Sequence, residues 1–210
     1  MRDKSRDAWQ ALYSRHGMQY GGAGDIGILK NVLRKGMLVL DAGCGDGKSS
    51  EVLARDFEVV GCDFSREALI SLRIQRDPDK RVELVECELS KLPFHSEKFD
   101  AIACVHALSH LMAKERRTAA AGLARVLKPG GYVLAEVFGA GDLRFGKGRK
   151  IEPGSFLRGN GIMTHYFMED ELGRLFKSLE LLDEAKSSEI VTYGTVSGRR
   201  EIIKALFLKP

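Results

Sequence analysis

Residues 39–50 read Val-Leu-Asp-Ala-Gly-Cys-Gly-Asp-Gly-Lys-Ser-Ser, and this stretch decides the fold. An apolar run ends at Asp41, glycines follow at alternate positions, and a polar segment able to start a helix comes next. Gly43, Gly45 and Gly47 let the backbone approach a ligand where any side chain would collide. A strand, a glycine-rich turn and a helix in this order are typical of the ligand-binding edge of an open α/β sheet.

Two nucleotide-binding patterns come close to this turn. The dinucleotide pattern G-x-G-x-x-G fails, because the third glycine arrives one residue early. The phosphate-binding loop G-x-x-x-x-G-K-[ST] nearly fits residues 42–49, with Ala42 in place of the first glycine and Gly47-Lys48-Ser49 at its end. The turn alone therefore leaves a P-loop NTPase open.

The composition indicates a globular chain whose net charge is too small to predict nucleic-acid binding by itself. The 210 residues are 44% hydrophobic and carry a formal net charge of +4, from which we expect one domain over 1–210. No apolar run reaches membrane-spanning length, and the N-terminus shows no secretory signal, so we expect a cytoplasmic protein without a membrane partner. The four cysteines have no metal-ligand spacing, so we expect no metal.

Three further segments follow the glycine turn. Residues 86–94 read Glu-Cys-Glu-Leu-Ser-Lys-Leu-Pro-Phe, residues 99–102 read Phe-Asp-Ala-Ile, and residues 127–131 read Leu-Lys-Pro-Gly-Gly. Together with Leu-Asp-x-Gly-x-Gly-x-Gly from Leu40, these motifs resemble the class I S-adenosylmethionine (SAM)-dependent methyltransferases. The resemblance runs without a gap from residue 37 to residue 138. The P-loop interpretation leaves the later motifs unexplained.

This resemblance implies a doubly wound α/β fold. Its sheet is mostly parallel and seven-stranded with the last strand antiparallel, and N-terminal helices are added. We expect apolar strands near 37–40, 57–61, 82–85, 99–105 and 132–138, and a final strand pair at 180–191 and 201–208. On this basis the chain divides into a helical cap (1–36), a SAM-binding core (37–138), a basic glycine-rich flap (139–165), and a C-terminal helix with the strand pair (166–210).

The resemblance also implies which residues hold SAM and its product S-adenosylhomocysteine. Asp63 follows the second strand, where an acidic side chain accepts hydrogen bonds from both ribose hydroxyls. Glu88 stands where relatives accept the adenine amino proton, and the backbone N–H of Leu89 faces the ring. Tyr20 belongs to an N-terminal segment that covers SAM in relatives. The full expected set is Asp41, Gly43, Gly45, Asp63, Phe64, Glu88, Leu89, Val105 and Tyr20.

The acceptor side is less defined. Residues 139–165 are rich in glycine and basic residues and have no periodicity, so we expect an irregular loop or flap able to hold a carboxylate, a phosphate or an RNA backbone. A general base is needed only where the acceptor loses a proton. His106, after the fourth strand, is the first candidate, and His165, next to the flap, is the second.

We therefore expect a methyltransferase that acts on a small, anionic, metabolite-like acceptor, as a monomer or homodimer. An RNA-modifying enzyme, with tRNA as the first case, is the alternative, since the flap is basic. Enzymes that methylate exocyclic amines of nucleic-acid bases usually carry Asn-Pro-Pro-Tyr where this chain has Ala-Cys-Val-His at 103–106, which argues against DNA. A SAM-binding module without catalysis is the remaining possibility beside the P-loop NTPase.

Overall fold

A computed structural model describes residues 2–16, 24–75, 82–193 and 195–210. Tyr20, expected over the cofactor, lies outside the described residues. None of the helices in the described ranges is long and apolar enough to cross a membrane. The helices are α1 (Arg2–His16), α2 (Ile28–Val32), α3 (Lys48–Leu53), α4 (Arg66–Gln75), α5 (Ala113–Val126) and α6 (Glu171–Leu175), with 3-10 turns η1 (Leu89–Lys91) and η2 (Ala107–His110).

The main sheet has seven strands in the order β3-β2-β1-β4-β5-β10-β9. Strands β1 to β5 are parallel, and β10 runs antiparallel to both β5 and β9, as expected. Because β1 pairs with β2 on one side and β4 on the other, the strand order reverses there, which opens a crevice at the carboxyl ends. The bounds are β1 (Leu38–Ala42), β2 (Glu58–Asp63), β3 (Val82–Glu86), β4 (Phe99–Val105), β5 (Leu127–Phe138), β9 (Glu180–Tyr193) and β10 (Val196–Leu208).

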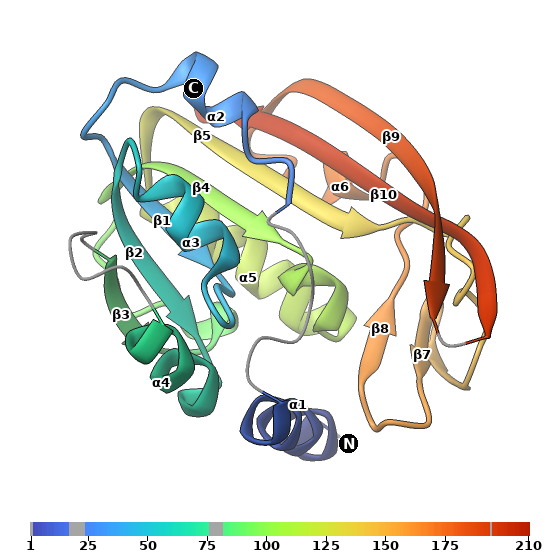
Figure 1. The fold of residues 1–210 in the computed structure, drawn as a ribbon. Coiled ribbons are helices and arrows are strands. Elements are labelled where there is room, and N and C mark those ends of the chain that lie inside the picture. Colours follow the sequence, from blue (N-terminus) through green and yellow to red (C-terminus); the bar gives the residue numbers. More distant parts are fainter. Residues whose placement is uncertain (1, 17–23, 76–81, 194) are drawn as a thin grey trace.

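Both faces of the parallel strands are buried. Along β4, Ile102 and Cys104 face one apolar cluster, and Ala101 and Ala103 face the other. Helix α5 covers the first face and α2 with α3 the second (Figure 1). This two-sided burial explains why the strands read as continuous apolar runs. Strand β5 begins earlier than expected, since a bulge lets Leu127 pair with Phe99 ahead of the turn.

The segment 139–165 differs from the expectation of an irregular flap. It contains a separate antiparallel sheet in the order β6-β7-β8, formed by Arg149–Glu152, Ser155–Leu157 and Met163–His165. The prediction of a loop without regular structure was wrong, because strands of three or four residues are too short to show a period of two in the sequence. Figure 1 shows β7 and β8 beyond the carboxyl ends of the main strands, with α1 on the same side.

Candidate functional site

A cavity of about 950 Å³ lies at the carboxyl edge of the parallel strands. Its walls come from the glycine turn, from the ends of β2, β4 and β5, from α1, from the sheet β6-β7-β8, and from β9 and β10. Every cofactor residue expected from the sequence, apart from Tyr20, lines it: Asp41, Gly43, Gly45, Asp63, Phe64, Glu88, Leu89 and Val105. His106 lines it as well, and His165 does not.

The glycine turn is held tightly against its neighbours. The backbone N–H groups of Gly43 and Cys44 both donate to the carbonyl of Cys62, at 2.8 and 3.0 Å. Gly43 has φ +79°, and a Cβ atom there would lie 2.4 Å from the Cβ of Ala107. Only glycine satisfies both the positive φ and the close approach, so the turn keeps its backbone open to the cavity.

Asp63 ends β2 and organises the cofactor end. Its carboxylate accepts hydrogen bonds from the backbone N–H of Gly45 at 3.0 Å and of Ser65 at 2.8 Å. Burial raises its pKa to about 6, against these hydrogen bonds, which lower it. Ser65 also caps α4 through its Oγ, which accepts from the N–H of Ala68 at 3.3 Å. Because Ser65 caps the helix, Asp63 is not needed as the cap, and its carboxylate lines the cavity.

Asp41 lies deeper, at the end of β1. Its carboxylate accepts a 2.6 Å hydrogen bond from the Oγ of Ser50 on α3. Burial raises its pKa to about 7, and the nearby charge of Asp63 adds to the rise, whereas the Ser50 hydrogen bond opposes it. A carboxylate buried at this cost next to a cavity is typical of a functional position rather than a structural one.

Helix α1 closes one side of the cofactor end. The guanidinium of Arg6 forms a 2.7 Å ion pair with Glu88 and lies 5.4 Å from the ring centroid of Phe64. The ring of Trp9 contacts His110 edge-on, with 4.8 Å between centroids. The carboxylate expected to face adenine is therefore shared with α1, a contact that no local sequence pattern indicates.

His106 stands between the cofactor end and the acceptor end. Its backbone has φ +60°, a rare conformation for a residue other than glycine. Its ring stacks on Phe138 with centroids 4.4 Å apart and 8° between planes, and its Nε2 lies 3.3 Å from Oε1 of Glu136. Burial, followed by the charges of His110, Arg200 and Arg144, lowers its pKa to about 3. The imidazole is therefore neutral at pH 7.

Glu136 is a site residue that the motifs do not indicate. It is 7% exposed, and its Oε2 accepts a 3.2 Å hydrogen bond from the N–H of Asp25. Burial raises its pKa. In the sequence, Glu136 could have been noticed only as a single carboxylate inside the otherwise apolar run of β5. Together with His106, it places two proton acceptors side by side at the middle of the cavity.

The acceptor end is strongly cationic. Arg144, Arg158 and Arg200 all line the cavity there. The guanidinium of Arg144 lies 4.6 Å above the ring of Phe138 and that of Arg200 lies 6.0 Å away. His110, at the same end, donates through Nδ1 to the carbonyl of Met163 at 2.9 Å, and burial lowers its pKa to about 4. Arginine of this kind matches a carboxylate or phosphate group.

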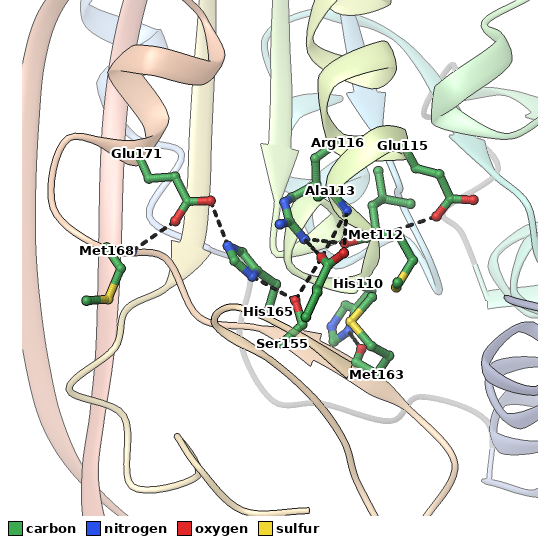
Figure 2. Close-up of polar contacts among 12 residues, drawn as sticks. His110, Met112, Ala113, Glu115, Arg116, Ser155, Met163, His165, Met168 and Glu171 are labelled. Atoms are coloured by element: carbon green, nitrogen blue, oxygen red, sulfur yellow. Dashed lines mark hydrogen bonds and ion pairs between the residues drawn. The ribbon is translucent and has the colours of Figure 1, made fainter. Parts of the chain in front are cut away.

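His165 lies instead in a buried polar network, shown in Figure 2. Its Nδ1 and the Oγ of Ser155 are 2.8 Å apart, and its Nε2 is 2.8 Å from Glu171 Oε1. Ser155 donates to Glu152 at 3.0 Å, and Glu152 accepts from Arg116 at 3.1 Å. This network ties β6-β7-β8 to α5 and α6. With 3% of its surface exposed, His165 is part of the anchor of this sheet.

Comparison with known proteins agrees with these features. A family model described as a methyltransferase domain matches residues 39–131. The tRNA N(3)-methylcytidine methyltransferase of Drosophila melanogaster is 31% identical over 159 residues, which are 70% of this chain and 49% of that protein. The tRNA (carboxymethyluridine(34)-5-O)-methyltransferase of Arabidopsis thaliana is 38% identical over 109 residues, 51% of this chain and 26% of that protein. The chain thus spans about half or less of these relatives' length.

A solved structure gives the same family. A SAM-dependent methyltransferase of Methanosarcina mazei superposes with a TM-score of 0.72 at 26% identity, covering 87% of this chain and 96% of that one. We therefore set aside the P-loop interpretation of Gly47-Lys48-Ser49, whose lysine lies 3.6 Å from Asp46. The turn, the strand order and these matches agree with one another, and the family's cofactor is SAM. The chain belongs to the class I SAM-dependent methyltransferases.

Proposed function

We propose that this protein transfers the methyl group of SAM to a metabolite-sized acceptor that carries an anionic group. The observation that supports this most is the continuity of one cavity of about 950 Å³, which contains the cofactor residues at one end and Arg144, Arg158 and Arg200 at the other. This volume is at the upper end of the range for small-molecule sites, which suits two ligands held end to end.

The cofactor roles follow from position. Asp63 accepts hydrogen bonds from the ribose hydroxyls, Glu88 and the backbone of Leu89 contact adenine, and the turn at Gly43 and Gly45 leaves room for the amino-acid part. Asp41, Phe64 and Val105 complete the cofactor wall. Methyl transfer from a sulfonium is an in-line displacement, so the protein's main task is to align the acceptor and exclude water.

His106 is the proposed general base. It lies on the cavity wall after β4, and its Nε2 stands 3.3 Å from Oε1 of Glu136. Its Nδ1 is buried and makes no hydrogen bond within the described residues, so Nε2 is the nitrogen available for proton transfer. Glu136, whose pKa is raised by burial, is able to receive the proton next. His165 has no comparable access, since both of its ring nitrogens are engaged in the anchor of β8.

A tRNA acceptor is the second candidate function. Both curated relatives reported above carry tRNA methyltransferase names, and Arg149 and Lys150 add exposed positive charge on β6. RNA binding by phosphate contacts weakens steeply as salt rises, whereas a small anion enclosed in a cavity loses less. The salt dependence of KM therefore separates the two acceptor classes.

The test uses SAM labelled on its methyl group. The purified protein is incubated with a cell extract that is then separated into small-molecule, RNA and protein fractions, and Asp63→Ala is the control. We expect label among the small molecules and none with the variant. Label in RNA would favour the tRNA candidate. SAM binding without label in any fraction would indicate a binding module, and no SAM binding at all would overturn the proposal.

A further inference from the structure

A second, smaller cavity of about 180 Å³ adjoins the acceptor end of the large one. Arg144, Lys147, Gly148, Arg158 and Gly159 line it. Arg144 and Arg158 line both cavities, so the two spaces are neighbours that share these two residues. An anionic group bound in the side pocket would therefore lie next to the acceptor end of the large cavity.

The charges of this side pocket are unbalanced. Arg144 is held by the buried carboxylate of Asp142, through Nε–Oδ1 at 2.8 Å and Nη2–Oδ2 at 3.1 Å, which orients its guanidinium. Neither Lys147 nor Arg158 forms an ion pair in the part of the chain that the structure describes. Three cations thus face one carboxylate, which leaves an excess of about two positive charges for a ligand to neutralise.

Two tight turns bring these cations together. The N–H of Lys147 donates to the carbonyl of Arg144 at 3.1 Å, and that of Gly161 donates to the carbonyl of Arg158 at 3.0 Å. Gly148 has φ +104°, and a Cβ atom there would lie 2.4 Å from the carbonyl oxygen of Leu157. Glycine is therefore required for the first turn to lie against β7. At Gly159 a Cβ atom would have nothing within 4 Å, so no close packing fixes glycine at this second turn.

We propose that this side pocket binds a phosphate monoester group of the methyl acceptor, an inference that rests on the proposed function. A phosphate monoester carries about −1.5 to −2 charges at pH 7, which matches the excess, whereas a carboxylate neutralises only half of it. Arginine binds phosphate through paired N–H groups, and lysine supplies a point charge. The acceptor class is therefore a phosphorylated small molecule, with its methylated atom close to His106.

The first experiment measures binding of inorganic phosphate to the full chain by calorimetry at low salt, with acetate as the carboxylate comparison. Lys147→Ala and Arg158→Ala remove pocket cations. Arg149→Ala and Lys150→Ala are matched controls, since both are exposed cations of β6 that line neither cavity. We expect phosphate to bind at least tenfold more tightly than acetate. Each pocket variant should weaken phosphate about tenfold, and the controls less than twofold. Unchanged SAM affinity shows that Lys147→Ala is folded.

Three results would contradict phosphate binding in the side pocket. They are no phosphate binding by the unaltered protein, equal losses in the pocket and control variants, or equal affinity for acetate. A short single-stranded RNA tests the other source of phosphate. RNA binding far tighter than that of a mononucleotide, and weakened as much by Arg149→Ala as by Arg158→Ala, would assign the charge to a polynucleotide surface instead.

Failure of the pocket and failure of the proposed function give different results. If labelled methyl groups reach a small-molecule acceptor with the same KM in the unaltered protein and in Lys147→Ala, the side pocket is wrong and the methyltransferase proposal stands. If the unaltered protein does not bind SAM, the proposed function is wrong whatever the phosphate measurements show. A KM increase of about tenfold in Lys147→Ala, with kcat little changed, is the result we expect.

Discussion

At the cofactor end of the cavity, Asp41, Gly43 and Asp63 come from two adjacent strands and the turn that follows the first of them, whereas Arg144 and Arg200 at the acceptor end come from distant segments. The first group is held by short backbone contacts, such as Gly43 to Cys62 at 2.8 Å. The acceptor end depends on a small sheet anchored by side chains, from Arg116 through Glu152 and Ser155 to His165. Local backbone geometry thus shapes the proposed cofactor end, and long-range side-chain contacts shape the proposed acceptor end.

The strongest test of the cofactor end, which backbone contacts hold in place, is Gly47→Ala. Gly47 has φ +89°, and its new Cβ would lie 2.1 Å from Cδ1 of the fully buried Leu72. We expect the free energy of unfolding to fall by about 4 kcal/mol, from overpacking plus the left-handed backbone. Urea denaturation measures it. Gly130→Ala is the control, because its φ is +73° with nothing within 4 Å of the new Cβ, so it should lose only about 1 kcal/mol.

Asp63→Ala tests whether the same end holds the ribose. Loss of two hydrogen bonds to a charged group should weaken SAM binding by about 3 kcal/mol, or roughly a hundredfold. Isothermal calorimetry gives the dissociation constant directly. Asp183→Ala, an exposed carboxylate on β9, is the control and should leave SAM affinity unaltered. A change of less than threefold in Asp63→Ala would remove this residue from the cofactor site.

The acceptor end, which depends on the anchored sheet β6-β7-β8, is tested by comparing two histidines. His165→Ala leaves Ser155 and Glu171 without their shared partner, so we expect a stability loss of about 2 kcal/mol. Below the unfolding transition, kcat should stay within about threefold of the original. His106→Ala should lower kcat by about a hundredfold with a smaller loss of stability, as for a general base. The opposite pattern would exchange the roles of the two residues.

The smallest effect concerns the pH dependence of stability at Asp41. Because its folded pKa of about 7 is raised above the unfolded value of 3.8, the folded state retains the proton where the unfolded state has lost it. The unfolding free energy therefore decreases as pH rises from about 4 to about 7. Asp41→Asn keeps an acceptor for Ser50 and should be more stable than the original protein at pH 8, while binding SAM more weakly. Equal stability at pH 8 would show that burial of Asp41 costs little.

Most of the cofactor half was predictable from the sequence, because its signals are local. The turn at 43–47 needs positive φ, the strands need continuous apolar residues, and an acidic residue after β2 is readable by position alone. Tyr20 stays a prediction, since it lies outside the described residues. The expected sheet and its antiparallel last strand were confirmed by the observed strand order.

The acceptor half was predicted only in part. Residues 139–165 were expected to form a basic flap able to hold an anionic group, and Arg144 and Arg158 of this segment line the cavity. The three short strands were missed, and Glu136 was not recognised because its partner His106 lies 30 residues earlier, in the turn after β4. His165 was placed beside the acceptor by its sequence position, and its partners Ser155 and Glu171 instead turn it into the protein interior.

The sequence alone determined the fold, the glycine turn and the carboxylates that line the cavity at the proposed cofactor end, because hydrophobic periodicity and positive φ act over a few neighbouring residues. Only the tertiary structure decided which histidine faces the cavity, which arginines gather at its acceptor end, and how α1 meets Glu88. Those outcomes depend on side chains separated by many residues, whose burial and pairing are set by the packing of the small sheet β6-β7-β8 against β5 and β10 of the main sheet.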